Sequence, residues 1–213
     1  MERKYKSTDR FIIALDQGLR TLYGKPESTG RESPAQDIPE SVQAKNDQRR
    51  VAGLMRVNHA GEIAAQALYY GQALTTENEH TRAALLNAAR EEGDHLEWCQ
   101  QRLSELNSHI SYLGPIWYLG SLTIGAMAGA RGDAFSLGFV AETEHQVSTH
   151  LSNHLQRLPQ EDSRSRQILL QMREDEEGHA NQALESGGKR LPWIVRRTMK
   201  MTAKVMTTLA YRI

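Results

Sequence analysis

One arrangement of acidic and histidine residues occurs twice in this chain, and it strongly restricts the folds that the chain can adopt. Each copy is a single glutamate followed by a Glu-x-x-His motif. The two copies are Glu62 with Glu92 and His95, and Glu144 with Glu176 and His179. Residues i and i+3 of an α-helix lie on one face about one turn apart, so each motif can direct a carboxylate and an imidazole to one point.

A break in the helical pattern separates each single glutamate from the motif that follows it. The first break is a polar stretch near residue 77, and the second contains Pro159, which cannot continue a helix. If the chain reverses at these breaks, each glutamate comes level with its motif on an antiparallel neighbouring helix. We therefore expect two helical hairpins that present their carboxylates at the same height.

The Glu-x-x-His spacing occurs four times in the chain, so the spacing alone is weak evidence. Glu77 and His80 fall in the expected reversal, away from any apolar stripe. Glu142 and His145 lie on the same expected helix as Glu144, and only Glu144 lies within that helix's apolar stripe. The stripe consists of Leu137, Val140, Val147, Leu151 and Leu155. We expect Glu144 to face the interior and Glu142 and His145 to point away from it.

The remaining glutamates of the repeat are also flanked by apolar residues at helical spacing, so four carboxylates are expected to face one apolar interior. Buried carboxylates need compensating positive charge, and only two histidines are expected there. A pair of metal ions would supply it, and four carboxylates with two imidazoles suit iron or manganese better than zinc. The set matches a known template, so the expected fold is all-α, a ferritin-like four-helix bundle with additional apolar or interfacial helices.

Two further acids, Glu91 and Asp175, each directly precede a glutamate of the repeat. An acid at such a position can accept the free ring N–H of a metal-binding histidine and fix its tautomer. Either residue can also be a solvated acid on a helix surface, so both interpretations stay open at this point.

Composition fits one helical domain with a substantial core. The chain has 213 residues, of which 39% are hydrophobic and 24% charged, and its formal net charge is zero. The chain has no excess of basic residues, so its composition does not indicate a nucleic-acid partner. The only cysteine, Cys99, excludes an intrachain disulfide and a four-cysteine iron–sulfur cluster, and we expect it in the core.

Residues 1–47 are expected to form an N-terminal amphipathic helix followed by a mobile connection, and residues 48–213 the bundle domain. The helix is expected over residues 9–22, and its apolar residues are Phe11, Ile12, Leu15, Leu19 and Leu22. The connection runs from Gly24 to about Asp47 and is rich in Pro, Ser, Gly, Glu and Gln, which is typical of mobile segments.

Two segments of the bundle domain favour contact with lipid. Residues 106–130 carry no charge, but Pro115 and several glycines, including Gly125 and Gly129, make them a poor spanning helix. We expect a helix lying across the bundle or at a membrane surface. Residues 188–213 contain seven basic residues and no acid, interleaved with apolar residues, which is typical of an interfacial amphipathic helix. The alternative is a helix packed on the bundle, and both descriptions can hold together.

Residues 55–62, 139–144 and 175–179 resemble the demethoxyubiquinone hydroxylase family of ubiquinone biosynthesis, and the resemblance covers about residues 48–213. All six metal-ligand positions of the family are matched, by Glu62, Glu92, His95, Glu144, Glu176 and His179. The resemblance implies a monooxygenase with two Fe ions per chain and O₂ as co-substrate. Its implied reaction hydroxylates the ring of a polyprenyl demethoxybenzoquinol.

The resemblance also implies a location and partners. It implies a peripheral membrane protein, on the cytoplasmic face of the cell membrane in a bacterium or on the mitochondrial inner membrane in a eukaryote. The implied partners are the polyprenylated quinol, the membrane surface, an electron donor or reductase, and other proteins of ubiquinone biosynthesis. No flavin or dinucleotide motif is visible, so electrons must come from a small donor, a partner reductase or the quinol itself.

Some members of that family carry a Glu and a Tyr where this chain has His145 and Leu151, so any role of those groups does not transfer. Two other classes of protein compete with the hydroxylase. One is a ferroxidase or iron-storage bundle, which would need polar iron-entry paths. The other is a non-catalytic, membrane-associated helical protein, which would bind no iron and consume no oxygen.

Overall fold

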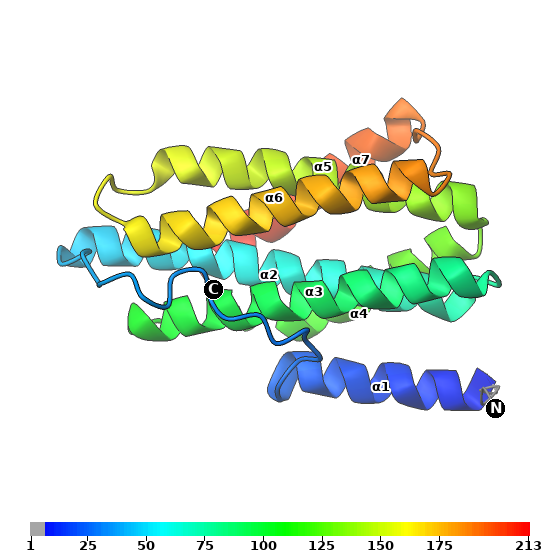
Figure 1. Ribbon diagram of the computed structural model, residues 1–213, viewed down its shortest axis with the longest axis horizontal. Helices are drawn as coiled ribbons and strands as arrows, with labels where there is room; N and C mark the ends of the chain where they lie inside the picture. Colours follow the sequence, from blue (N-terminus) through cyan, green and yellow to red (C-terminus); the bar gives the residue numbers. More distant parts are fainter. Residues whose placement is uncertain (1–6) are drawn as a thin grey trace.

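The computed structural model describes residues 7–213, which form helices joined by loops and turns and include no strand. The helices are α1 (Ser7–Tyr23), α2 (Lys45–Thr75), α3 (Glu79–Glu105), α4 (Gly114–Gly129), α5 (Asp133–Arg157), α6 (Ser163–Glu185) and α7 (Trp193–Ala210). Helices α2, α3, α5 and α6 form a four-helix bundle, with α4 in the connection between its two hairpins (Figure 1). The predicted all-α, ferritin-like fold is confirmed.

Both hairpins reverse near the positions that the sequence indicates. Asn78 caps α3, because its side-chain oxygen accepts hydrogen bonds from the backbone N–H groups of His80 (2.9 Å) and Thr81 (3.2 Å). Asp162 caps α6 by accepting the N–H of Ser165 at 3.0 Å. These short turns bring the middle of each helix level with the middle of its neighbour.

Two clusters of buried apolar side chains fill the two halves of the bundle, one including Tyr69 and Leu85 and the other Leu54 and Leu169. The repeat residues lie where one cluster gives way to the other. On α5, for example, Glu144 lies between Val140 of the first cluster and Leu151 of the second. Carboxylates in the middle of the bundle are therefore enclosed by apolar layers above and below.

The uncharged segment forms α4, which packs against α2 with the two backbones almost in contact. A Cβ atom at Gly125 would overlap the carbonyl oxygen of Leu68, and one at Gly71 would overlap that of Leu122. Only glycine leaves room for such an approach. The helix expected across the bundle or at a membrane surface therefore lies along α2. Among residues 7–213, no helix has both the length and the apolar character that a membrane span requires.

Residues 24–44, which we call the strap, connect the end of α1 to the start of α2. They contain no helix and run along the bundle (Figure 1). Glu40 pairs with Arg102 of α3, and the carbonyl of Ile38 accepts a hydrogen bond from Arg164 of α6. The composition of the strap predicts mobility, but its partners lie far away in the sequence, and composition cannot reveal them. In the structure the strap is held by specific contacts.

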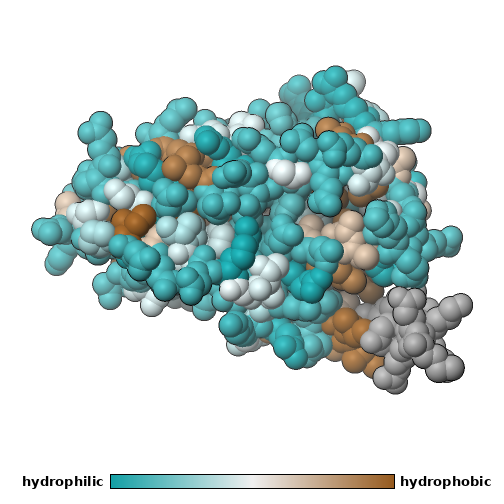
Figure 2. Space-filling model, viewed as in Figure 1, coloured by the Kyte–Doolittle hydropathy of each residue, from teal (hydrophilic) through white to brown (hydrophobic). Residues whose placement is uncertain are grey.

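Helix α1 covers the region where an amphipathic helix is expected, although the side chain of Phe11 lies outside the described residues. Its side chains of Ile12, Leu15 and Leu19 are exposed. The face of the molecule seen in Figure 2 is mostly hydrophilic, with a hydrophobic area over α1. Leu22 of the same helix packs against the bundle core, so only part of the apolar side of α1 is covered within residues 7–213.

Candidate metal centre

The bundle brings all six repeat residues together in its interior. Glu62 comes from α2, Glu92 and His95 from α3, Glu144 from α5, and Glu176 and His179 from α6. Every one of them is buried. They form two groups of four, and within each group one ligand atom per residue lies within 4.8 Å of the others.

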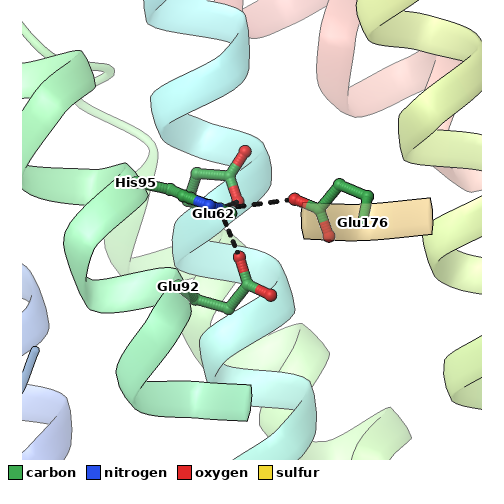
Figure 3. Close-up of side chains that lie close together, drawn as sticks. All are labelled: Glu62, Glu92, His95 and Glu176. Atoms are coloured by element: carbon green, nitrogen blue, oxygen red, sulfur yellow. Dashed lines mark hydrogen bonds and ion pairs between the residues drawn. The ribbon is translucent and has the colours of Figure 1, made fainter. Parts of the chain in front are cut away.

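The first group contains Glu62, Glu92, His95 and Glu176 (Figure 3). The ring nitrogen Nδ1 of His95 lies at its centre. It is 3.0 Å from Oε2 of Glu92, 3.3 Å from Oε1 of Glu176 and 3.7 Å from Oε2 of Glu62. Three carboxylates and one imidazole nitrogen thus converge from three helices, as the ligands of a single metal ion must.

The second group contains Glu92, Glu144, Glu176 and His179, so it shares two glutamates with the first. Nδ1 of His179 lies 3.4 Å from Oε1 of Glu92 and 3.5 Å from Oε2 of Glu176. Each shared glutamate therefore turns one oxygen toward each histidine. Two groups of possible metal ligands that share carboxylates are compatible with a metal site.

The crowded carboxylates carry strongly shifted pKa values. Burial raises the pKa of Glu62 well above its ordinary value, and the charges of Glu92 and Glu176 add to this rise. Burial and the neighbouring Glu176 raise the pKa of Glu144 in the same direction. Burial acts on Glu92 as well, but the two nearby histidines hold its pKa below the ordinary value.

The two histidines of the centre also have shifted pKa values. Burial would lower the pKa of His95 and His179, but the carboxylates around them raise both pKa values above the ordinary range. In addition, both oxygens of Glu144, both of Glu176 and Nδ1 of His179 have no hydrogen-bond partner among residues 7–213. Buried acceptors without donors and an excess of negative charge fit bound cations.

The outer ring nitrogens of the histidines are held by acids from the opposite hairpin. Nε2 of His95 lies 2.9 Å from Oδ2 of Asp175, and Nε2 of His179 lies 2.7 Å from Oε2 of Glu91. Each acid accepts the ring N–H, which leaves Nδ1 free for a metal ion. Of the two interpretations that the sequence leaves open for Glu91 and Asp175, the structure supports the hydrogen-bond acceptor.

The two competing Glu-x-x-His pairs lie outside the centre. His145 is exposed, and the side chain of Glu142 accepts a hydrogen bond from Gln146 at 2.8 Å. Glu77 and His80 are both exposed in and beside the first turn. Cys99 is buried in the apolar core, as expected.

Comparison with known proteins agrees with this geometry. The family model described as "Ubiquinone biosynthesis protein COQ7" matches residues 49–210. The chain belongs to this family. The match spans α3 to α7 and all of α2 except its first four residues, so all six repeat residues lie inside the COQ7 region.

Proteins named 3-demethoxyubiquinol 3-hydroxylase are close relatives along nearly the full length. The one from Nitrosococcus oceani is 55% identical over 98% of this chain and 98% of its own. One from Acinetobacter baumannii is 53% identical over 98% and 99%, and one from Legionella pneumophila is 50% identical over 96% and 97%. These relatives match the strap as well as the COQ7 region.

One residue near the centre is not among the site residues that the sequence predicts. Arg31 of the strap pairs with Asp175 at 2.9 Å, and Asp175 in turn holds His95. It stands in a stretch whose composition suggests mobility, so no periodicity marks it. The only sequence clue is Asp94, an acid inside the motif of Glu92 and His95, to which Arg31 also binds at 2.9 Å.

Proposed function

We propose that this chain is a 3-demethoxyubiquinol 3-hydroxylase that holds two iron ions and uses O₂ to hydroxylate the ring of a polyprenyl demethoxybenzoquinol in ubiquinone biosynthesis. One observation carries the proposal. In a chain 50–55% identical to proteins of that name, the repeat residues form two overlapping, buried groups with metal-ligand chemistry.

Each residue of the centre has a distinct part in this proposal. Glu92 and Glu176 would bridge the two ions, Glu62 and His95 would complete one coordination shell, and Glu144 and His179 the other. Bound iron would supply the redox chemistry that activates O₂ and that no side chain can perform. The protein orients these ligands, and its apolar layers keep water from the reacting oxygen.

A polyprenyl quinol is a lipid, so the enzyme needs access to a membrane surface. Three helices offer apolar side chains that nothing in residues 7–213 covers. These are Ile12, Leu15 and Leu19 of α1, Ile116, Leu119 and Met127 of α4, and Trp193, Ile194, Met201 and Val205 of α7. We call this set the apolar surface.

Helix α1 contacts α4, where Tyr118 packs against Gly18. Trp117 of α4 packs against the small cluster of Val57, Ala60 and Ala210, to which α7 contributes Ala210. Exposed apolar patches of this extent mark interaction sites. The exposed basic residues of α7 would add attraction to anionic lipid. These observations support peripheral membrane association.

The decisive experiment determines the source of the oxygen atom that is added to the quinol ring. Full-length protein, reconstituted anaerobically with iron and reduced, is mixed with ¹⁸O₂ and a short-chain demethoxyubiquinol. We expect mass spectrometry to find one ¹⁸O on the ring of the product. The control uses ¹⁶O₂ and H₂¹⁸O, and label entering from water would contradict a monooxygenase.

The same experiment tests the ferroxidase and iron-storage alternative. A storage protein would oxidise iron to ferric mineral and leave the quinol unchanged. The names of the relatives favour the hydroxylase, and no comparison favours storage. The electron donor and the length of the isoprenoid chain are separate questions, which turnover with defined donors and quinols would answer.

A further inference from the structure

The strap is attached to the metal centre through the two residues in the middle of the first Glu-x-x-His motif. Asp94, whose side chain is only 1% exposed, accepts the backbone N–H groups of Thr29 (3.0 Å) and Gly30 (2.9 Å) on one oxygen. A Cβ atom at Gly93 would overlap the carbonyl oxygen of Glu27. Gly93 therefore lets the strap approach α3, and Asp94 fixes it there.

Arg31 extends this attachment to the opposite hairpin. Its Nε lies 2.9 Å from Oδ2 of Asp94, and one of its terminal nitrogens lies 2.9 Å from Oδ2 of Asp175. That same oxygen of Asp175 accepts Nε2 of His95 at 2.9 Å. A continuous series of charged contacts thus links the strap to a histidine whose Nδ1 faces the first metal group.

The guanidinium of Arg31 is held from several sides. It lies over the ring of Trp98, 5.0 Å from the ring centre, and the indole N–H of Trp98 donates to the Arg31 carbonyl at 3.2 Å. Trp98 also contacts the ring of His95, with 5.3 Å between the ring centres. Asp175 itself is only 14% exposed, and Gln171 donates to its other oxygen at 3.0 Å.

The corresponding acid of the second metal group has no such support. The side chain of Glu91 is 39% exposed, and within residues 7–213 its only ion-pair partner is His179. The two histidines are therefore held differently. The acceptor of His95 is fixed by an arginine in a largely enclosed place, whereas the acceptor of His179 stands at the surface.

We propose that Arg31 is a positioning residue that fixes Asp175 and, through it, His95, so that the group of Glu62, Glu92, His95 and Glu176 is the tighter of the two metal positions. This inference rests on the metal-binding part of the proposed function and not on the reaction. Acids that hold a ligand histidine typically change metal affinity 10- to 100-fold when they are altered. Arg31 pairs with the acid that holds His95, which is Asp175.

The test measures metal binding and not activity. Metal-free, full-length protein is titrated anaerobically with Co²⁺, whose visible absorption reports its coordination. We expect two affinities in the unaltered chain. Arg31→Gln should weaken the tighter one by about 10- to 100-fold and leave the weaker one nearly unchanged. Arg31→Lys should fall between the two, because it keeps the charge but loses the planar fork that reaches two acids.

Two controls separate positioning from a general structural role. Arg173→Gln removes the same charge from α6, where the ion-pair partner of Arg173 within residues 7–213 is Glu177 at 3.9 Å, and should leave both affinities unchanged. In chains carrying Asp175→Asn, adding Arg31→Gln should cause no further loss, because Arg31 acts through Asp175. Thermal unfolding of the metal-free variants verifies that each variant is folded.

The outcomes distinguish this inference from the proposed function. Unchanged Co²⁺ affinities in Arg31→Gln, or a further loss in the Asp175→Asn background, would overturn the positioning role of Arg31 and leave the hydroxylase proposal standing. A failure of the unaltered chain to bind Co²⁺ would overturn the metal centre and this inference together. The predicted pattern of affinities without ¹⁸O incorporation would count against the hydroxylase alone.

Discussion

At the scale of single residues, the candidate metal centre depends on which face of a helix each carboxylate occupies. Glu144 and Glu142 stand two positions apart on α5, which places them on nearly opposite sides of the helix. Glu144 is completely buried, and both its oxygens are free of protein donors within residues 7–213. Glu142 is half-buried and accepts a hydrogen bond from Gln146.

This difference predicts contrasting effects of two alanine variants. Glu144→Ala removes a ligand from the second metal group, so we expect iron after anaerobic reconstitution to fall from about two per chain to one or fewer. Glu142→Ala is the matched control and should keep about two. Elemental analysis of desalted protein measures both. Iron retained by Glu144→Ala and lost by Glu142→Ala would show that the wrong carboxylate has been assigned to the centre.

At the scale of helices, the close approach of α4 to α2 depends on glycines. Gly125 lies against the backbone of α2, whereas Gly120, on the same helix, has nothing within 4 Å of the position of a Cβ. The two glycines share a helix and differ in their surroundings. They therefore form a natural pair for testing how closely α4 must approach the bundle.

We expect alanine to have opposite effects at these two positions. Gly120→Ala should raise the free energy of unfolding by about 0.5–1 kcal/mol, because alanine favours the helix and restricts the unfolded chain. Gly125→Ala should lower it by about 1–3 kcal/mol, because the added methyl group forces α4 away from the carbonyl of Leu68. Urea unfolding of both variants gives the comparison. Equal stabilisation by both would mean that α4 is not tightly packed on α2.

At the scale of the whole molecule, the four-helix bundle is enclosed by elements of different character. The strap lies on α3 and α6 and pairs charged groups, whereas α1, α4 and α7 carry the apolar surface. Helix α7 has two roles in this arrangement. Val195 and Met199 pack against the bundle core, while Trp193 and Ile194 on the same helix are exposed. The sequence leaves open a helix packed on the bundle and an interfacial helix. Helix α7 is packed on the bundle, and it is also interfacial if its exposed side meets lipid.

This asymmetry predicts where vesicles bind. Replacing the exposed Arg197, Lys200 and Lys204 of α7 with Gln should release much of the protein from anionic vesicles at low salt, because each basic residue contributes about 1 kcal/mol near such a surface. High salt should have the same effect on the unaltered chain. Cosedimentation measures the bound fraction.

The matched control removes three charges from elements outside the apolar surface, Lys25 of the strap, Arg90 of α3 and Arg173 of α6. It should bind vesicles nearly as well as the unaltered chain. If the two triple variants lose binding equally, net charge and not α7 would govern attachment.

The sequence alone determined the helical fold and the six residues of the centre, because both depend on local regularities. A period of 3.6 residues places Glu144 and not Glu142 inside the bundle, and an i, i+3 spacing brings Glu92 level with His95. Polar breaks midway between the paired glutamates indicate where each hairpin reverses. Such patterns are written in neighbouring residues, so they can be recognised before any tertiary contact is known.

Only the tertiary structure decided which acids contact the two histidines and how the strap packs on the bundle. It placed Glu91 beside His179 and Asp175 beside His95, each across two hairpins, where the sequence also left a surface acid open. It also turned a strap with the composition of a mobile linker into a support that carries Arg31 to the centre. These contacts join residues far apart along the chain. Their formation depends on the geometry of the packed helices, which no local pattern contains.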